Sequence, residues 1–215
     1  MTRTVLVVLL AIGLALTPAA VAKTRKHRPA PCSLTGSKTL LQTRNARVFY
    51  RTDVKRGTTT EYACMFARNK RFALASGDSE AGGSGDTASL ETLSGSWVAF
   101  ARGRFDDSTR YDPSFQGFPQ SAVGINLSTG AQLAFPAIGG SPTPSTVSDL
   151  VLGKNGSFAW IGSGGGRSEV HRLKAGEGTD AVLDSGAGIQ AGSLALGGGT
   201  LYWMKGGSVF TAPLG

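Results

Sequence analysis

One imidazole and one carboxylate in this sequence are spaced so that they could perform acid–base chemistry. Glu169 and His171 are two residues apart in a stretch whose alternating residues predict a β-strand. Side chains two apart on a strand point to the same face of a sheet. A carboxylate that positions an imidazole can carry a proton to or from a substrate. Such a pair is more often a solvated contact between neighbouring side chains, and the sequence marks no nucleophile to go with it.

A second group of chemically useful residues falls in the polar segment between Gly103 and Gln120, which combines carboxylates with aromatic rings. Loops longer than about 12 to 15 residues tend to be functional or disordered, and aromatic faces with carboxylates between them suit a sugar ring or a peptide side chain. The alternative is a loop that folds back and buries its own rings over the domain. The predicted ligand-contacting residues are Phe105, Asp107, Tyr111, Phe115 and Phe118.

If the protein is an enzyme, these two regions contain its plausible acid–base groups, which would suit a secreted polysaccharide hydrolase or lyase. They are Asp106, Asp107, Asp112, Glu169 and His171. The three aspartates do not have the spacing of an EF-hand loop, so a solvated acidic segment is favoured and no metal site is expected. The sequence has no Walker loop, no Gly-x-Ser-x-Gly elbow and no His-Glu-x-x-His motif. We therefore expect no cofactor.

Positive charge is concentrated in the first third of the chain. The formal net charge is +8, but residues 23–71 contain 13 Lys and Arg against two acidic residues, whereas residues 72–215 contain 8 against 12. Such asymmetry attracts an anionic partner to one end of a protein. The predicted contact residues are Arg44, Arg47, Arg51, Arg56, Arg68 and Arg71.

The partner of this basic region would be an anionic cell-surface polymer or an extracellular protein. Nucleic acid is disfavoured, because stacking aromatic residues are not interleaved with these arginines as they are on an RNA-binding sheet. Arginines at strand edges can also serve only to prevent edge-to-edge pairing, with no ligand at all. The charge pattern alone does not separate these possibilities.

The first 22 residues have the form of a secretory signal peptide. Arg3 precedes an apolar run from Val5 to Leu16, Pro18 interrupts the run, and Ala-Val-Ala at 20–22 supplies the small residues of a cleavage site. We expect residues 1–22 to be removed, residues 23–37 to form a basic N-terminal segment, and the protein to be secreted or extracytoplasmic. An uncleaved anchor is the alternative, because basic residues follow the apolar run directly.

The two cysteines agree with export. Cys32 and Cys64 form no Cys-x-x-Cys motif and have only two histidines to accompany them, so the spacings of a metal finger are absent. Pairing is expected in an oxidising compartment, and a bridge across about 32 residues would stabilise the fold by roughly 3 to 4 kcal/mol. It would fix the N-terminal segment to the first part of the domain. The alternative is two separate buried thiols.

A degenerate repeat organises residues 38–215. In four segments a leucine is followed nine or ten residues later by an aromatic residue, with a Gly or Asn turn signal between them, as expected of a β-hairpin. The segments are 40–50, 90–100, 150–160 and 194–203. Further short strands are predicted after each hairpin, which gives three meanders of four strands and a last one of three. The 31 glycines and the absence of helical periodicity agree with an all-β chain.

The last repeat resembles a known type of blade. Residues 199–203, Gly-Thr-Leu-Tyr-Trp, with the stretches at 207–210 and 213–215, resemble a degenerate blade of YWTD-type β-propellers, although Met204 and Lys205 stand where that family has Thr-Asp. Residues 125–130 are similar to a turn that is common in bacterial secreted propellers. The resemblance implies a β-propeller-like fold of about four blades, its last blade incomplete or closed by residues 32–38. A β-sandwich or an open meander is the alternative.

Taken together, these patterns predict an exported, non-catalytic binding or interaction module that docks to anionic or glycan-rich extracellular material. A secreted polysaccharide hydrolase or lyase is the first alternative, and a structural domain without a ligand is the second. The basic first repeat and the aromatic loop are the two regions in which a binding site is expected.

Overall fold

The computed structural model describes residues 32–78, 83–109, 118–139 and 144–215. The expected signal peptide and most of the basic N-terminal segment lie outside these ranges. Within them every regular element is a β-strand, apart from one short 3₁₀ helix, η1 (Asp107–Thr109). No helix in the described residues is long and apolar enough to cross a membrane.

The strands form four consecutive antiparallel meanders, which we call blades 1 to 4. Blade 1 comprises β1 (Lys38–Gln42), β2 (Ala46–Asp53), β3 (Thr58–Met65) and β4 (Lys70–Asp78). Blade 2 comprises β5 (Ser84–Ser94), β6 (Trp97–Asp106), β7 (Ser121–Asn126) and β8 (Gln132–Pro136). Blade 3 comprises β9 (Thr146–Leu152), β10 (Phe158–Gly164), β11 (Arg167–Leu173) and β12 (Ala181–Gly186). Blade 4 comprises β13 (Ala195–Gly197), β14 (Thr200–Lys205) and β15 (Ser208–Pro213).

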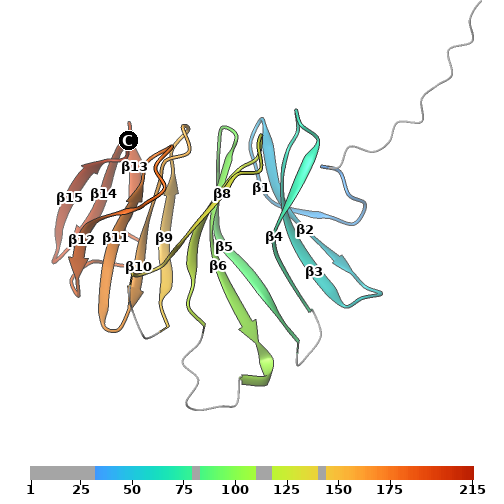
Figure 1. Ribbon diagram of the computed structural model, residues 1–215, viewed down its shortest axis with the longest axis horizontal. Helices are drawn as coiled ribbons and strands as arrows, with labels where there is room; N and C mark the ends of the chain where they lie inside the picture. Colours follow the sequence, from blue (N-terminus) through green and yellow to red (C-terminus); the bar gives the residue numbers. More distant parts are fainter. Residues whose placement is uncertain (1–31, 79–82, 110–117, 140–143) are drawn as a thin grey trace, which may run out of the picture.

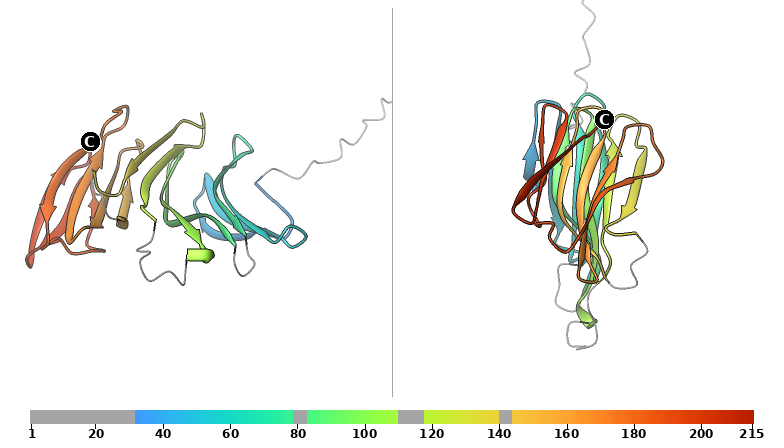
Figure 2. Two further views of the ribbon diagram at one scale, coloured as in Figure 1. Left: turned by 60° about the horizontal axis from the view of Figure 1, so that its bottom comes forward. Right: turned by 90° about the vertical axis from the view of Figure 1, so that its left-hand side faces the viewer.

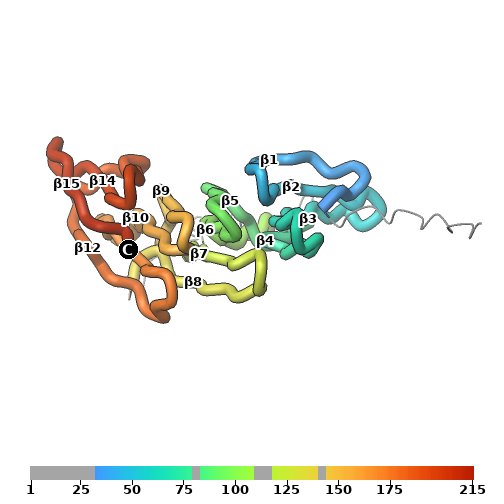
Figure 3. Tube along the Cα trace, turned by 90° about the horizontal axis from the view of Figure 1, so that it is seen from above, coloured from blue at the N-terminus to red at the C-terminus, as the bar shows by residue number. Residues whose placement is uncertain are grey.

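The blades stand in a row and pack face to face, as Figures 1 and 2 show. The first strands of successive blades are neighbours, so that β1, β5 and β9 lie along one side of the row while β8 and β12 lie along the other (Figure 3). Blades 1 and 2 are also joined edge to edge through a single pairing between Gly77 and Gly85. Successive four-stranded meanders with adjacent first strands are the architecture of a β-propeller. The predicted all-β, propeller-like fold is therefore confirmed.

The row of blades is open. Blades 1 and 4 lie at opposite ends of the molecule (Figure 1), and no described segment pairs with the free edge of β15. The last blade is thus incomplete, which was one of the two expectations. Closure by residues 32–38 is not observed, because a disulfide between Cys32 and Cys64 holds the described N-terminal segment on β3 of blade 1.

Three apolar layers between the blades make up most of the core. Val48 packs with Phe100 between blades 1 and 2, Phe158 packs with the alanines of β6 between blades 2 and 3, and Ile161 packs with Leu201 between blades 3 and 4. A strand with a blade on each side is buried on both faces, so β6 and β10 contain continuous apolar runs at 98–101 and 158–161. These runs contain the aromatic residues of the repeat.

Candidate functional site

The face of blade 1 that points away from blade 2 carries three of the predicted arginines. Arg47 on β2 lies opposite Cys64 on β3, which in turn lies opposite Arg71 on β4. Residues directly opposite in an antiparallel sheet share a face, and Arg51 shares that face because it is four residues from Arg47 on the same strand. Val48, the residue next to Arg47, faces the core shared with blade 2. Adjacent residues of a strand point to opposite faces, so the arginines face outward.

A polar groove of about 350 Å³ runs along this outward face. Arg51 and Arg56 line it together with four hydroxyl-bearing residues and Asp53, and Arg71 lies next to it with its guanidinium 5.4 Å from the ring centroid of Tyr62. The side chains of Arg51, Arg56 and Arg71 are exposed. We call these three residues and the groove the arginine face. The hydroxyl-bearing residues are Thr58, Thr60, Tyr62 and Ser76.

Arg47 differs from its neighbours because it is engaged within the protein. Its guanidinium donates hydrogen bonds to the hydroxyls of Thr39 (3.0 Å) and Ser37 (3.1 Å) and lies 4.1 Å from the ring centroid of Phe49. Desolvation by burial lowers the pKa of the Arg47 guanidinium. Arg47 therefore holds the N-terminal segment against blade 1.

The remaining two predicted arginines lie at one end of blade 1. Arg44 is in the β1–β2 turn and Arg68 is in the β3–β4 turn, and these turns are linked by a 2.9 Å hydrogen bond from the amide of Phe66 to the carbonyl of Asn45. Arg56 is in the β2–β3 turn at the opposite end. The six arginines therefore do not form one cluster, and the groove gathers only some of them.

The predicted disulfide is present on the same outward face. Cys32 and Cys64 are bonded, and both are buried with Phe49, which stacks on Tyr62 at 5.5 Å between ring centroids. Leu34 packs against this cluster. The segment from Cys32 thus forms a small satellite core on blade 1, next to the groove.

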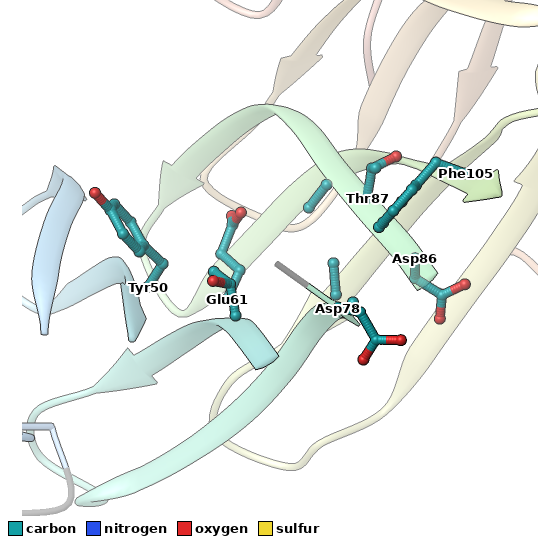
Figure 4. Close-up of a pocket in the computed structure, with 10 residues that line it drawn as sticks. Tyr50, Glu61, Asp78, Asp86, Thr87 and Phe105 are labelled. Atoms are coloured by element: carbon teal, nitrogen blue, oxygen red, sulfur yellow. The ribbon is translucent and has the colours of Figure 1, made fainter. Parts of the chain in front are cut away.

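A second hollow lies between blades 1 and 2, and we call it the interblade cavity. Its volume is about 410 Å³. Tyr50 from β2 and Phe105 from β6 lie on opposite sides of it, and the carboxyl group of Glu61 from β3 points into the space between them (Figure 4). Asp78 and Asp86 line the same cavity from β4 and β5, whereas the described lining includes no lysine or arginine.

Glu61 interacts with a second carboxyl group. Desolvation by burial, followed by the charge of Glu91 and a hydrogen bond with it, raises the pKa of Glu61 to about 7. Two neighbouring carboxyl groups in a partly desolvated site share a proton, because both cannot readily carry a charge. One Glu61 oxygen, Oε1, is buried without a hydrogen-bond partner among the described residues.

Two strand irregularities lie beside this carboxyl pair. The β3–β4 ladder shifts register between Glu61 and Tyr62, and the β5–β6 ladder shifts between Ser89 and Thr92, which leaves Leu90 and Glu91 outside the regular pairing. Leu90 has a φ of 57°, a left-handed conformation that costs a branched side chain about 1 kcal/mol or more. β-Bulges redirect side chains and are frequent next to functional sites.

The structure describes three of the five residues predicted from the aromatic loop. Phe105 lines the interblade cavity. Asp107 begins η1 and its amide donates to the carbonyl of Gly83 at 3.0 Å, while the ring of Phe118 lies 5.3 Å from the guanidinium of Arg104. Tyr111 and Phe115, together with Asp112, lie outside the described residues. Ligand contact by the loop thus remains a prediction, with Phe105 as its link to a cavity.

Glu169 and His171 share a face of the sheet as expected, but the pair is buried and is not the solvated contact that the sequence favoured. Glu169 Oε2 lies 3.0 Å from His171 Nε2, and Asp180 Oδ2 lies 2.6 Å from His171 Nδ1. The imidazole stacks on Trp160 at 4.8 Å between centroids, and both Glu169 and His171 are buried between blades 2 and 3. Arg167 forms an ion pair with Glu169 at 3.2 Å. Because carboxylates engage both ring nitrogens and neither residue lines the two hollows above, this arrangement supports a structural role.

The four residues with titratable side chains that line the interblade cavity were not predicted from the sequence. Tyr50 and Glu61 lie on β2 and β3, while Asp78 and Asp86 lie on the two strands that meet at the junction of blades 1 and 2. Strand alternation could have placed Tyr50 and Glu61 on the inner face of blade 1. Tyr50 is two residues from the buried Val48 on the same strand, and Glu61 is its partner on the next strand. The described residues contain no group of three or more His, Cys, Asp or Glu side chains placed to hold a metal ion.

No family model and no curated protein match this sequence. Among solved structures, an acylaminoacyl peptidase shares 10% identity over 82% of this chain and 32% of its own, with a TM-score of 0.42. An exo-β-1,3-galactanase from Phanerochaete chrysosporium shares 9% identity over 82% and 46%, with a TM-score of 0.38. A prolyl endopeptidase shares 14% identity over 86% and 36%, with a TM-score of 0.35.

This chain therefore spans between about a third and a half of the length of these proteins. Likeness at such identities and TM-scores gives no information on activity or ligand, and no family match supports the YWTD type in particular. The class that the structure defines is an all-β protein built from an open row of propeller-like blades, with a basic outer face and an acidic cavity between its first two blades.

Proposed function

We propose that this protein is an exported binding module that docks to an anionic polysaccharide through the arginine face of blade 1. The observation that carries the proposal is the groove of about 350 Å³ lined by Arg51 and Arg56 on an outward face. Guanidinium groups make paired, charge-assisted hydrogen bonds to carboxylate, sulfate or phosphate oxygens. The hydroxyl groups of Thr58, Thr60 and Ser76 line the same groove and would contact the sugar hydroxyls.

The covalent architecture of blade 1 favours this role. The disulfide and Arg47 fix the segment beside the groove, so the guanidinium groups project from a rigid sheet. A rigid surface loses little conformational entropy when it binds. A disulfide is also consistent with an oxidising, extracellular compartment, where anionic polysaccharides are available as partners.

The test uses immobilised dextran sulfate, with uncharged dextran as the matched matrix. We expect the protein to bind dextran sulfate at low salt and to be released at roughly 0.3 to 0.5 M NaCl, because salt screens exposed charges. Replacement of Arg51→Gln together with Arg56→Gln should weaken binding about tenfold, since each exposed ion pair contributes about 0.5 to 1 kcal/mol.

The control variant replaces two lysines of blade 3, Lys154→Gln with Lys174→Gln, which removes the same charge at a distance from the groove. It should bind dextran sulfate as the unmodified protein does. Equal losses in the two double variants would show that net charge and not the arginine face governs binding. Binding that persists in 1 M NaCl, or none at low salt, would overturn the proposal.

The hydrolase alternative has less structural support. Glu169 and His171 are buried between blades 2 and 3, whereas Asp106 accepts hydrogen bonds from the amide and hydroxyl of Ser108 at the end of β6. Of the acid–base groups suggested by the sequence, the four that the structure describes do not line either hollow. Release of reducing ends from an anionic polysaccharide by the purified protein would favour the hydrolase over the binding module.

A further inference from the structure

The interblade cavity combines two aromatic rings with several carboxyl groups and no opposing cation in its described lining. Tyr50 and Phe105 flank the space, and Glu61, Asp78 and Asp86 line it. The neighbouring strand β6 carries two arginines on the face of Phe100, and neither is part of the lining. The guanidinium of Arg102 lies 5.4 Å from the ring centroid of Phe100, and Arg104 lies opposite Asp86 in the β5–β6 ladder. The cavity therefore has negative charge without a partner for it in the lining.

Its chemistry selects against neutral and anionic ligands. A neutral sugar could stack on the rings, but it would leave the carboxylate charges uncompensated in a partly desolvated site. A primary ammonium group forms charge-assisted hydrogen bonds with carboxylates and is attracted to the faces of aromatic rings within about 6 Å. The carboxyl group of Glu61, which points into the space between the two rings, is an acceptor for such a donor.

We propose that the interblade cavity is a binding site for a small organic ammonium ligand, with the ammonium group at Glu61 and the carbon skeleton between Tyr50 and Phe105. A cavity of about 410 Å³ is large enough for one hexosamine or a short diamine. The site is separate from the arginine face, which lies on the other side of the blade 1 sheet. The ammonium ligand of the interblade cavity has the opposite charge to the polysaccharide proposed for the arginine face.

Ammonium binding at Glu61 must be coupled to proton release. The pKa of free Glu61 is near 7 because of burial and the neighbouring Glu91. A bound cation favours the charged carboxylate, so Glu61 loses its proton as the ligand enters. The other titratable or charged groups on the strands around it are Glu91 and Asp86 from β5, Asp78 from β4, Tyr50 from β2, and Arg102 and Arg104 from β6. One-proton linkage predicts affinity that falls about tenfold between pH 8 and pH 6.

Isothermal titration of the full chain with two matched pairs of probes tests the site. The first pair is glucosamine and N-acetylglucosamine, and the second is cadaverine and 1,5-pentanediol. We expect the charged member of at least one pair to bind with a dissociation constant of about 1 mM or lower at pH 8, and the neutral members to bind at least tenfold more weakly. Preference between glucosamine and cadaverine distinguishes an amino sugar from an alkylamine as the natural source.

The variants identify the carboxyl group responsible. Glu61→Gln should weaken binding of the charged probe at least tenfold and abolish its pH dependence, and the matched control Glu177→Gln, an exposed residue between β11 and β12, should change neither. If Glu61→Gln does not fold, Asp86→Asn at the exposed rim should weaken binding a few-fold. The proposal is wrong if neutral probes bind as tightly as charged ones, if Glu61→Gln leaves the affinity unchanged, or if no probe binds at 50 mM.

Discussion

Glu61 and Glu91 form a partly buried pair of carboxyl groups next to the layer between blades 1 and 2. Glu91 lies in the register shift of the β5–β6 ladder, whereas Glu61 is on the regularly paired face of β3 that also carries the buried Ala63. Burial, with the charge of Glu91, raises the pKa of Glu61 from its usual value near 4.5 to about 7. A group whose pKa is raised on folding favours the folded state only where it is protonated.

Replacement of Glu61→Gln should therefore remove a pH dependence of stability. Below pH 4.5 Glu61 is protonated in both the folded and the unfolded states and costs nothing. Between about pH 4.5 and pH 7 the unfolded chain has released this proton while the folded protein retains it. The unmodified protein should therefore lose about 1 to 2 kcal/mol across this range, a value reduced for solvent screening of a half-buried carboxyl. Urea unfolding at pH 5 and pH 8 measures this loss.

In the Glu61→Gln variant the same two unfolding curves should lie closer together by that amount, and at pH 8 the variant should be at least as stable as the unmodified protein. Glu177→Gln serves again as the control, because Glu177 is exposed and far from the cavity. A variant that is less stable at pH 8 than at pH 5 by the same margin as the unmodified protein would show that Glu61 does not titrate in this range.

At the scale of elements, the N-terminal segment is attached to blade 1 rather than to blade 4. The disulfide spans 32 residues and fixes the segment to β3. Cys32 and Cys64, with Phe49, form a satellite core that is separate from the layers between the blades. This core is small, so its stability depends on the covalent bond more than on buried area.

The double variant Cys32→Ser with Cys64→Ser should lower the free energy of unfolding by roughly 3 to 4 kcal/mol, because the unfolded chain regains the freedom of the 32-residue loop. Urea unfolding with and without dithiothreitol provides the measurement. The reductant should destabilise the unmodified protein by a similar amount and leave the double variant unaffected. If dithiothreitol destabilises both proteins equally, the bridge is not the group being reduced.

On the scale of the whole molecule, the close contact between blades 2 and 3 depends on a glycine. Gly162 on β10 faces blade 2, and a Cβ atom there would overlap the carbonyl group of Ala137. The same carbonyl oxygen accepts a 3.1 Å hydrogen bond from Nε1 of the buried Trp160. Blades 2 and 3 can approach this closely only because residue 162 is glycine.

Gly162→Ala should thus force the two blades apart and destabilise the protein by about 2 to 3 kcal/mol, the upper range for overpacking of a core. Gly178→Ala provides the matched control, because an added Cβ there meets no atom within 4 Å. Thermal unfolding, followed by the fluorescence of Trp160 and the other tryptophans, distinguishes the two variants. Equal midpoints for Gly162→Ala and the unmodified protein would contradict the close packing of these blades.

The sequence by itself determined the local structure of this protein. The leucine-to-aromatic spacing with Gly or Asn turns predicted the hairpins at 40–50, 90–100, 150–160 and 194–203, and all of them are present as β1–β2, β5–β6, β9–β10 and β13–β14. The shared face of Glu169 and His171 was predicted for the same reason. Strand alternation and turn preference depend on neighbours along the chain, so they can be read without knowledge of the fold.

Only the tertiary structure decided which faces meet and what lies between them. The cavity of Glu61, Tyr50 and Phe105 joins residues from different blades. The register shift that leaves Glu91 outside the regular pairing depends on the partner strand β6. The separation of Arg51 and Arg56 from Arg44 and Arg68 follows from the meander, which sends alternate turns to opposite ends of a blade. These features rest on contacts between distant residues, whose spacing along the sequence contains no periodic signal.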